Sequence, residues 1–144
     1  MARKIAISNQ KGGVGKTTTA VNLASCLAAA EKRTLLIDMD PQANSTSGIG
    51  LAKEKIVSSI YDALIGEKNI HDTIITTDME FLKVLPSSIA LVGAEIELVS
   101  MMSREHQLKK ILKPLDDDFD FIVIDCPPSL GLLTINVLTA SDSV

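Results

Sequence analysis

The sequence predicts an α/β fold in which a parallel sheet carries helices on both faces. Short runs of apolar, largely β-branched residues alternate along the chain with longer segments of helix-forming residues. The apolar runs lack the polar alternation of a half-exposed strand, which is typical of parallel strands buried on both sides. Because 144 residues lie within the usual size of one domain, we interpret residues 1–144 as a single domain.

In the amino-terminal part of the chain, strand and helix signals follow one another closely. Residues 4–8 form an apolar run that polar residues end, which predicts a buried strand. Residues 17–30 contain neither Gly nor Pro and space their apolar side chains as a helix does. A second buried strand is predicted at 34–37 and must stop before Pro41. We expect a polar loop over 42–50.

The middle of the chain continues the alternation. Residues 56–65 predict a helix, with Gly66 at the position of a carboxyl-terminal cap. Residues 81–85 predict a third strand. Ser103 is expected to cap a further helix, whose early acidic and late basic residues complement the helix dipole. Residues 119–124 then predict a fourth strand.

The last segment resembles the start of another repeat of the pattern. Residues 131–140 predict a helix, and residues 141–144 resemble the approach to a further strand. We therefore expect the chain to be truncated at its carboxyl terminus and to be the first part of a longer domain.

Composition excludes several classes of protein. The net charge of -4 and the pI near 5.1 provide no basic field for wide contact with nucleic acid. Cys26 and Cys126 are too few for a disulfide framework and do not form a zinc or redox spacing, so we expect a reducing, cytoplasmic setting. No apolar run reaches the about eighteen residues of a membrane span, and no membrane partner is expected.

A glycine-rich segment joins the first predicted strand to the first predicted helix, which is the context of a phosphate-binding loop. Glycines let backbone N–H groups face a phosphate, and the helix amino terminus attracts anions. Lys16 would reach the β and γ phosphates of ATP, and Thr17 would place its hydroxyl on Mg²⁺. The nucleotide-binding residues predicted here are Lys11, Gly12, Gly13, Val14, Gly15, Lys16, Thr17 and Thr18.

This loop departs from the ordinary pattern G-x-x-x-x-G-K-[ST]. The first glycine of that pattern would fall on residue 10, where the chain has Gln10. The variant with a lysine directly before two glycines does match, through Lys11. The loop is therefore of the deviant Walker A type, which is narrower than the parent pattern.

Carboxylates follow two other predicted strands. Asp38 and Asp40 come after the second strand, and Asp125 ends the fourth. Ligands of open α/β sheets lie outside the carboxyl ends of the strands, so these side chains are expected beside the loop. Thr17, Asp38 and Asp125 are the predicted magnesium residues, since Mg²⁺ prefers oxygen ligands. Asp40 is the candidate for positioning the attacking water, although Asp38 and Asp40 are also typical of turns.

Three motifs together resemble the ParA/Soj family of chromosome- and plasmid-partitioning ATPases. They are the loop at 11–18, Asp-Met-Asp-Pro-Gln at 38–42 and Ile-Asp-Cys-Pro-Pro-Ser at 124–129. The segments 93–98 and 129–134 are also similar to the Soj branch. The resemblance covers the whole chain.

The resemblance implies slow, Mg²⁺-dependent ATP hydrolysis that acts as a dimerisation switch. In this family the lysine matching Lys11 crosses an ATP-bound homodimer to the partner's phosphates, so the expected catalytic residues are Lys11, Lys16 and Asp40. A ParB-like centromere-binding protein stimulates hydrolysis, and the dimer binds DNA without sequence preference through the carboxyl-terminal part that this chain lacks. The full-length family is cytoplasmic and nucleoid-associated.

Two other functions remain open at this point. A MinD-like membrane-associated ATPase would need a carboxyl-terminal amphipathic helix. A nucleotide-binding or interaction module without turnover is the alternative from a different class, because family ATPases are longer than this chain. A nitrogenase iron-protein relative would need cluster-binding cysteines, for which Cys126 is poorly placed.

Overall fold

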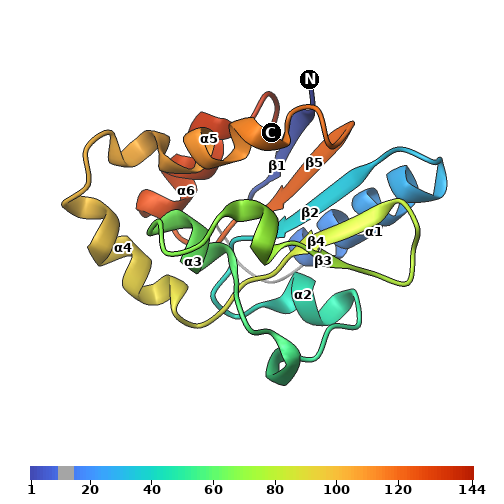
Figure 1. Ribbon diagram of the computed structural model, residues 1–144, viewed down its shortest axis with the longest axis horizontal. Helices are drawn as coiled ribbons and strands as arrows, with labels where there is room; N and C mark the ends of the chain where they lie inside the picture. The colour runs from blue at the N-terminus through green and yellow to red at the C-terminus, as the bar shows by residue number, and fades with distance from the viewer. Residues whose placement is uncertain (10–14) are drawn as a thin grey trace.

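The computed structural model describes residues 1–9 and 15–144. Within these residues lies one sheet of five strands in the order β1-β5-β2-β4-β3, drawn as arrows in Figure 1. β1, β5, β2 and β4 pair in parallel, and β3 pairs antiparallel with β4 at the edge. The strands are β1 (Arg3–Ile7), β2 (Thr34–Asp38), β3 (Ile75–Thr76), β4 (Leu82–Leu85) and β5 (Phe121–Asp125).

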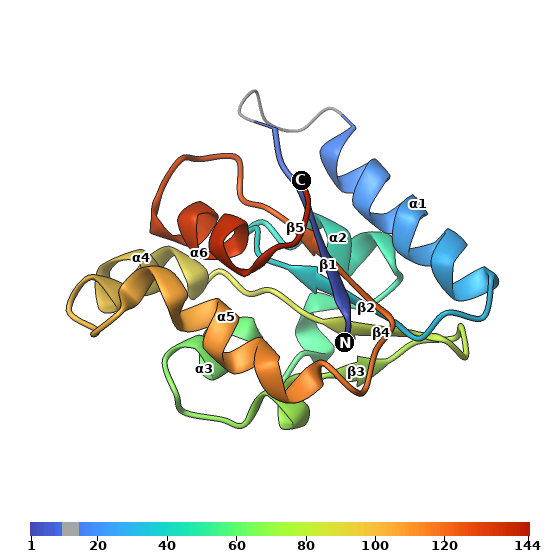
Figure 2. The ribbon, with the colours of Figure 1, turned by 90° about the horizontal axis from the view of Figure 1, so that it is seen from above.

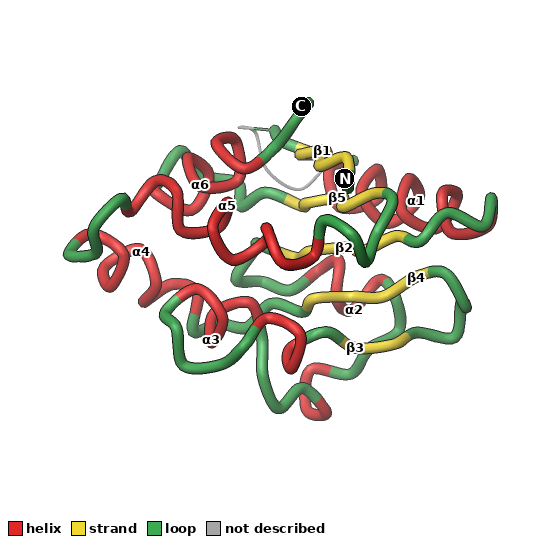
Figure 3. The backbone as a smooth tube through the Cα atoms, turned by 45° about the horizontal axis from the view of Figure 1, so that its top comes forward, coloured by secondary structure: helices red, strands yellow, loops and turns green. Residues whose placement is uncertain are grey.

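Helices cover both faces of this sheet, as the sequence predicts. Figure 2 shows α1 along one face with α2 beside it, and α5 and α6 across the opposite face, where α3 and α4 extend the layer. Figure 3 shows the strands between these two layers. The helices are α1 (Lys16–Ala29), α2 (Asn44–Gly48), α3 (Ile60–Leu64), α4 (Leu91–Val99), α5 (Gln107–Leu112) and α6 (Leu132–Ala140). Short 3₁₀ helices span Lys53–Lys55, Ile70–Thr73, Arg104–His106 and Lys113–Leu115.

Each face of the sheet has its own hydrophobic core. On the α1 side, Ala20, Ala24 and Ala28 recur at four-residue spacing and pack on Leu36 and Val123. These small side chains allow α1 to lie close to the strands. The larger core on the other face combines leucines and isoleucines of β2 and β5 with the buried sides of α3 to α6. The two cores hold the carboxyl ends of β1, β2 and β5 in fixed register.

Two expectations for residues 42–65 are wrong. The polar loop expected at 42–50 contains the helix α2, and the helix expected over 56–65 is only α3, Ile60–Leu64. α3 begins late because Ser59 forms a capping box with Asp62, which satisfies the free N–H groups at that point. The end of α3 is as predicted, since Gly66 adopts a left-handed φ of 82° just beyond it.

Three further features differ from the prediction. The antiparallel strand β3 and the helix α4 were not expected. Ser103 does not cap a helix: it has a φ of 51° and makes no side-chain cap bond. Asn136 of α6 supplies polar contacts there instead, accepting from the Leu108 amide at 3.0 Å and donating to the Arg104 carbonyl at 2.8 Å.

The last residues lie beside β1. Ser143 forms a parallel bridge with Ile5, and the Ala6 amide donates to the Ser143 carbonyl at 2.9 Å. Residues 141–144 therefore approach the sheet as a strand would, which matches the prediction. In the described part of the chain, no helix is both long enough and apolar enough to cross a membrane.

Candidate active site

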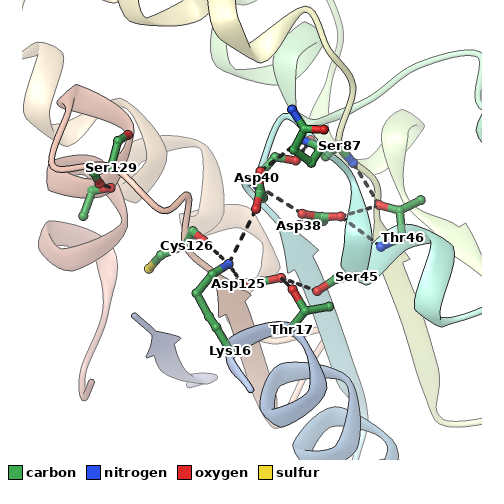
Figure 4. Close-up of polar contacts among 12 residues, drawn as sticks. Lys16, Thr17, Asp38, Asp40, Ser45, Thr46, Ser87, Asp125, Cys126 and Ser129 are labelled. Atoms are coloured by element: carbon green, nitrogen blue, oxygen red, sulfur yellow. Dashed lines mark hydrogen bonds and ion pairs between the residues drawn. The ribbon is translucent and has the colours of Figure 1, made fainter. Parts of the chain in front are cut away.

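Five of the predicted site residues, Lys16, Thr17, Asp38, Asp40 and Asp125, meet where β2, β5 and the start of α1 come together. In the sheet register Asp125 lies beside Ile7 of β1 and beside Asp38 of β2. Lys16 begins α1, directly after Gly15, whose φ of 87° favours glycine. Figure 4 shows Lys16, Thr17, Asp38, Asp40 and Asp125 converging on this point from three elements.

Lys16 is the central cation of the cluster. Its ammonium pairs with Asp125 Oδ1 and donates to the Cys126 carbonyl. Asp40 Oδ2 lies 3.7 Å from the same nitrogen. The side chain of Lys16 is only 2% exposed, so this charge is held by protein oxygens and not by bulk water.

Asp125 also binds two hydroxyl groups. Thr17 Oγ1 donates to Asp125 Oδ2 at 3.2 Å, and the hydroxyl of Ser45 donates to the same oxygen. Ser45 lies on α2 and was not predicted as a site residue. It could not have been identified from the sequence, because its segment reads as a polar loop.

The Asp38 carboxylate accepts three hydrogen bonds from nearby residues. Oδ2 accepts from the Thr46 amide at 2.9 Å and from the Thr46 hydroxyl at 2.8 Å, and Oδ1 accepts from the Asp40 amide at 3.0 Å. Burial raises the pKa of Asp38 to about 6, although the bonds from Thr46 oppose this shift. The geometry therefore places Asp38 in the framework that holds the loop after β2.

Asp40 faces Lys16 and is fixed by its own loop. Its Oδ1 accepts from the Gln42 amide at 3.0 Å, and its carbonyl accepts from the Ser87 hydroxyl at 2.6 Å. Asp40 as a whole is 5% exposed. Ser87 follows β4 and was also missed, since a lone serine after a strand carries no local signal.

For the other predicted residues of the phosphate-binding loop, little can be said of their contacts. Lys11, Gly12, Gly13 and Val14 lie outside the described residues, so their predicted contacts with phosphate have no geometry here. Thr18 is exposed on the first turn of α1.

The donor set suits a hard cation. The Thr17 hydroxyl and the Asp125 carboxylate place oxygen atoms side by side, and oxygen is the ligand atom that Mg²⁺ prefers. Across residues 1–9 and 15–144, no group of three or more His, Cys, Asp and Glu side chains could by itself hold a metal. A magnesium ion that also takes phosphate oxygens and waters needs no such group.

Cys126 packs in the core beside β5, as its sequence context predicts. Burial raises the pKa of its thiol to about 11, against the attraction of the Lys16 charge. The thiol is therefore neutral, and the part of Cys126 that contacts Lys16 is its carbonyl.

Comparison with known proteins identifies the family of this chain. A family model described as "AAA domain" matches residues 2–144. Sporulation initiation inhibitor protein Soj of Bacillus subtilis is 57% identical over 144 residues, which are 100% of this chain and 57% of Soj. Chromosome partitioning protein ParA of Myxococcus xanthus is 54% identical, covering 100% of this chain and 51% of ParA.

A solved structure shares the fold. It is that of cobyrinic acid a,c-diamide synthase from Mycobacterium smegmatis with bound ADP and magnesium, with a TM-score of 0.94 and 44% identity over 98% of this chain and 57% of that one. The chain thus spans little more than half the length of the proteins it matches. It belongs to the AAA-domain family, and it is similar to Soj of Bacillus subtilis and to the chromosome partitioning protein ParA of Myxococcus xanthus.

Proposed function

We propose that this chain binds ATP with magnesium and forms the phosphate-binding part of a partitioning ATPase of the Soj/ParA type. The observation that carries the proposal is the convergence of Lys16, Thr17 and Asp125 at the carboxyl ends of the strands. The similar Mycobacterium smegmatis protein, which holds ADP and magnesium, supports the same ligands for this chain. Residues 1–144 would then be one domain, continued by further residues in the whole protein.

Lys16 and Thr17 are the residues we assign to the nucleotide and its metal. Lys16 would exchange its contacts with Asp125 for contacts with the β and γ phosphates, which together carry more negative charge than one carboxylate. Thr17 would bind Mg²⁺ directly, and Asp125 would hold the water shell of the ion. Magnesium would neutralise the charge that develops on the phosphates.

Asp40 is our candidate for orienting the attacking water. Its Oδ2 lies 3.7 Å from Lys16 Nζ, which places the carboxylate beside the phosphate-binding cation without a tight bond to it. Asp38 has no comparable freedom, because its oxygens accept from Thr46 and from the Asp40 amide. We therefore assign Asp38 to the structure of the loop and not to the magnesium ion.

The similarity to Soj and ParA supports a proposal about the wider role of the whole protein. We propose that ATP binding joins two copies of the whole protein, that Lys11 reaches the partner's phosphates, and that slow hydrolysis separates them. A ParB-like protein would stimulate hydrolysis, and the ATP-bound dimer would bind DNA through residues beyond this chain. Identity with Soj is 57% and with ParA 54%, against 44% with cobyrinic acid a,c-diamide synthase. These values favour a role in partitioning over diamide synthesis.

A nucleotide module without turnover is the second candidate. The chain spans 57% of Soj, so groups that complete catalysis in the relatives can lie outside it. The described site would still bind phosphate, because Lys16, Thr17 and Asp125 are all in place.

Both candidates are tested by measuring ATP binding and turnover with and without magnesium. Loss of binding in Lys16→Ala, together with loss of turnover but retained binding in Asp40→Ala and Lys11→Ala, supports the ATPase. Binding by the wild-type chain without turnover supports the module. Lys110→Ala, at an exposed lysine of α5, is the matched control. Absence of Mg·ATP binding by the folded wild-type chain would refute both.

A further inference from the structure

The main chain of Asp40 is held on both sides by buried polar groups. Its amide donates to Asp38 Oδ1 at 3.0 Å, and its carbonyl accepts from the Ser87 hydroxyl at 2.6 Å. Ser87 is 1% exposed and comes from the loop after β4, which is distant in sequence from Asp40. Figure 4 shows Ser87 and Asp38 next to Asp40.

Ser87 is itself firmly placed. Its amide donates to Thr46 Oγ1 at 3.3 Å, and that hydroxyl donates to Asp38 Oδ2 at 2.8 Å. The neighbouring Pro86 carbonyl accepts from the Ile60 amide of α3 at 2.9 Å. A closed ring of hydrogen bonds thus joins Asp38, Thr46, Ser87 and Asp40, and α3 anchors it from outside.

We propose that Ser87 is a positioning residue for Asp40, acting through its main chain. The inference rests on the proposed role of Asp40 in orienting water. With Asp40 Oδ1 bound to the Gln42 amide, the position of the other oxygen, Oδ2, depends on where the backbone of residue 40 is held. A shift of about 1 Å in a catalytic group can lower a rate by about a hundredfold, so a single short bond to this backbone matters.

The variant Ser87→Ala isolates this bond. The Asp40 carbonyl keeps the Ala43 amide at 2.8 Å as a donor, so no buried carbonyl loses all its partners. The amide of residue 87 also keeps Thr46. We therefore expect Ser87→Ala to fold.

A rescue variant and a control are available in the same chain. Ser87 lines a hollow of about 270 Å³ with Pro41 and Ile56. Ser87→Thr keeps a hydroxyl group that can donate to the Asp40 carbonyl. Ser141 donates to the Val137 carbonyl, also at 2.6 Å, but at the end of α6 away from the site. Ser141→Ala therefore removes an equivalent bond elsewhere.

The first measurement separates kcat from KM for Mg·ATP hydrolysis. We expect Ser87→Ala to lower kcat about tenfold with KM within about twofold of wild type, Ser87→Thr to restore most of kcat, and Ser141→Ala to match wild type. A purely structural role would change both constants or neither. Wild-type kcat in Ser87→Ala would overturn the proposal.

The second measurement does not depend on turnover, and it decides the case if the wild-type chain does not hydrolyse ATP. Amide hydrogen exchange is followed at Gln42 and Ala43, whose N–H groups bond to Asp40. We expect exchange at least about threefold faster in Ser87→Ala than in wild type and Ser141→Ala, for the loss of one hydrogen bond. Unchanged exchange would show that Ser87 does not hold Asp40. Failure of the ATPase proposal alone would leave this readout intact.

Discussion

The Lys16 ammonium and the Asp125 carboxylate form an ion pair whose side chains are 2% and 0% exposed. Burying two charges costs several kcal/mol each unless the remaining donors and acceptors are satisfied. Here the Cys126 carbonyl supports the ammonium, and the hydroxyls of Thr17 and Ser45 support the carboxylate. Protein groups thus surround both members of this buried ion pair.

Removing one partner of this pair should destabilise the fold. Lys16→Ala leaves Asp125 as a buried anion with only neutral donors, and we expect a loss of about 3 kcal/mol in the free energy of unfolding. Urea denaturation near neutral pH measures it. Lys110→Ala, at an exposed lysine, should change stability by less than about 0.5 kcal/mol. Equal stability of the two variants would mean that the pair is not held as described.

The raised pKa of Asp38 predicts a dependence of stability on pH. Its ordinary value of 3.8 becomes about 6 in the folded protein, chiefly by burial. Between these values the folded state binds more protons at Asp38 than the unfolded state does, so stability falls as pH rises. The contribution is fully present below about pH 4 and is lost as pH rises through 6.

Asp38→Asn removes this titration and tests it. The difference in unfolding free energy, variant minus wild type, should rise by about 2 kcal/mol between pH 4 and pH 7. Denaturant unfolding at several pH values measures the difference, and Asp72→Asn, at an exposed aspartate, should show a much smaller change. A flat difference across this range would contradict a raised Asp38 pKa.

Much of the sheet and the centre of the site could be predicted from the sequence. The apolar runs that became β2 and β5 are recognisable because strands buried on both faces have no polar alternation. The runs that became β1 and β4 were predicted too, although each contains an exposed residue. Parallel strands bring their carboxyl ends to one edge, so Lys16, Thr17 and Asp125 were expected to meet, and they do. Asp38 lies at the same edge, but its oxygens bind the protein instead of facing outward.

The features that escaped prediction depend on contacts between distant residues. The segment Asn44–Gly48 is made of weak helix formers, yet it is helical where the Thr46 amide and the Ser45 hydroxyl bind carboxylates of β2 and β5. Ser87 is a single residue whose partner lies 47 positions away. No local sequence pattern predicts hydrogen bonds between residues so far apart in the chain.

The capping box of α3 should be measurable by itself. Ser59 Oγ accepts from the Tyr61 amide at 3.2 Å, and Asp62 Oδ2 accepts from the Ser59 amide at 2.8 Å. Ser59→Ala should lower the free energy of unfolding by about 1 kcal/mol. The adjacent Ser58→Ala, outside the box, is the control for thermal or urea unfolding. If both variants unfold alike, the cap does not set the start of α3.

Glu95 joins α4 to the amino-terminal end of α6. Its carboxylate accepts from the Leu132 amide at 2.8 Å and from the Leu133 amide at 3.2 Å, so it caps α6 from another helix. α6 follows directly on the loop after Asp125. A Cβ at Gly131 would collide with this carboxylate, although a backbone φ of -83° and ψ of -170° suits any residue.

A double-mutant cycle should therefore show strong coupling between Gly131 and Glu95. Gly131→Ala alone should cost about 1–2 kcal/mol because the new methyl group displaces the cap. In the Glu95→Ala background, which has already lost the cap, the same change should cost less than about 0.5 kcal/mol. Gly93→Ala is the control: its Cβ would meet Glu97 at an ordinary 3.5 Å within α4, so it should be neutral or stabilising. Additive costs at 131 and 95, measured by urea unfolding, would show that the glycine is there for another reason.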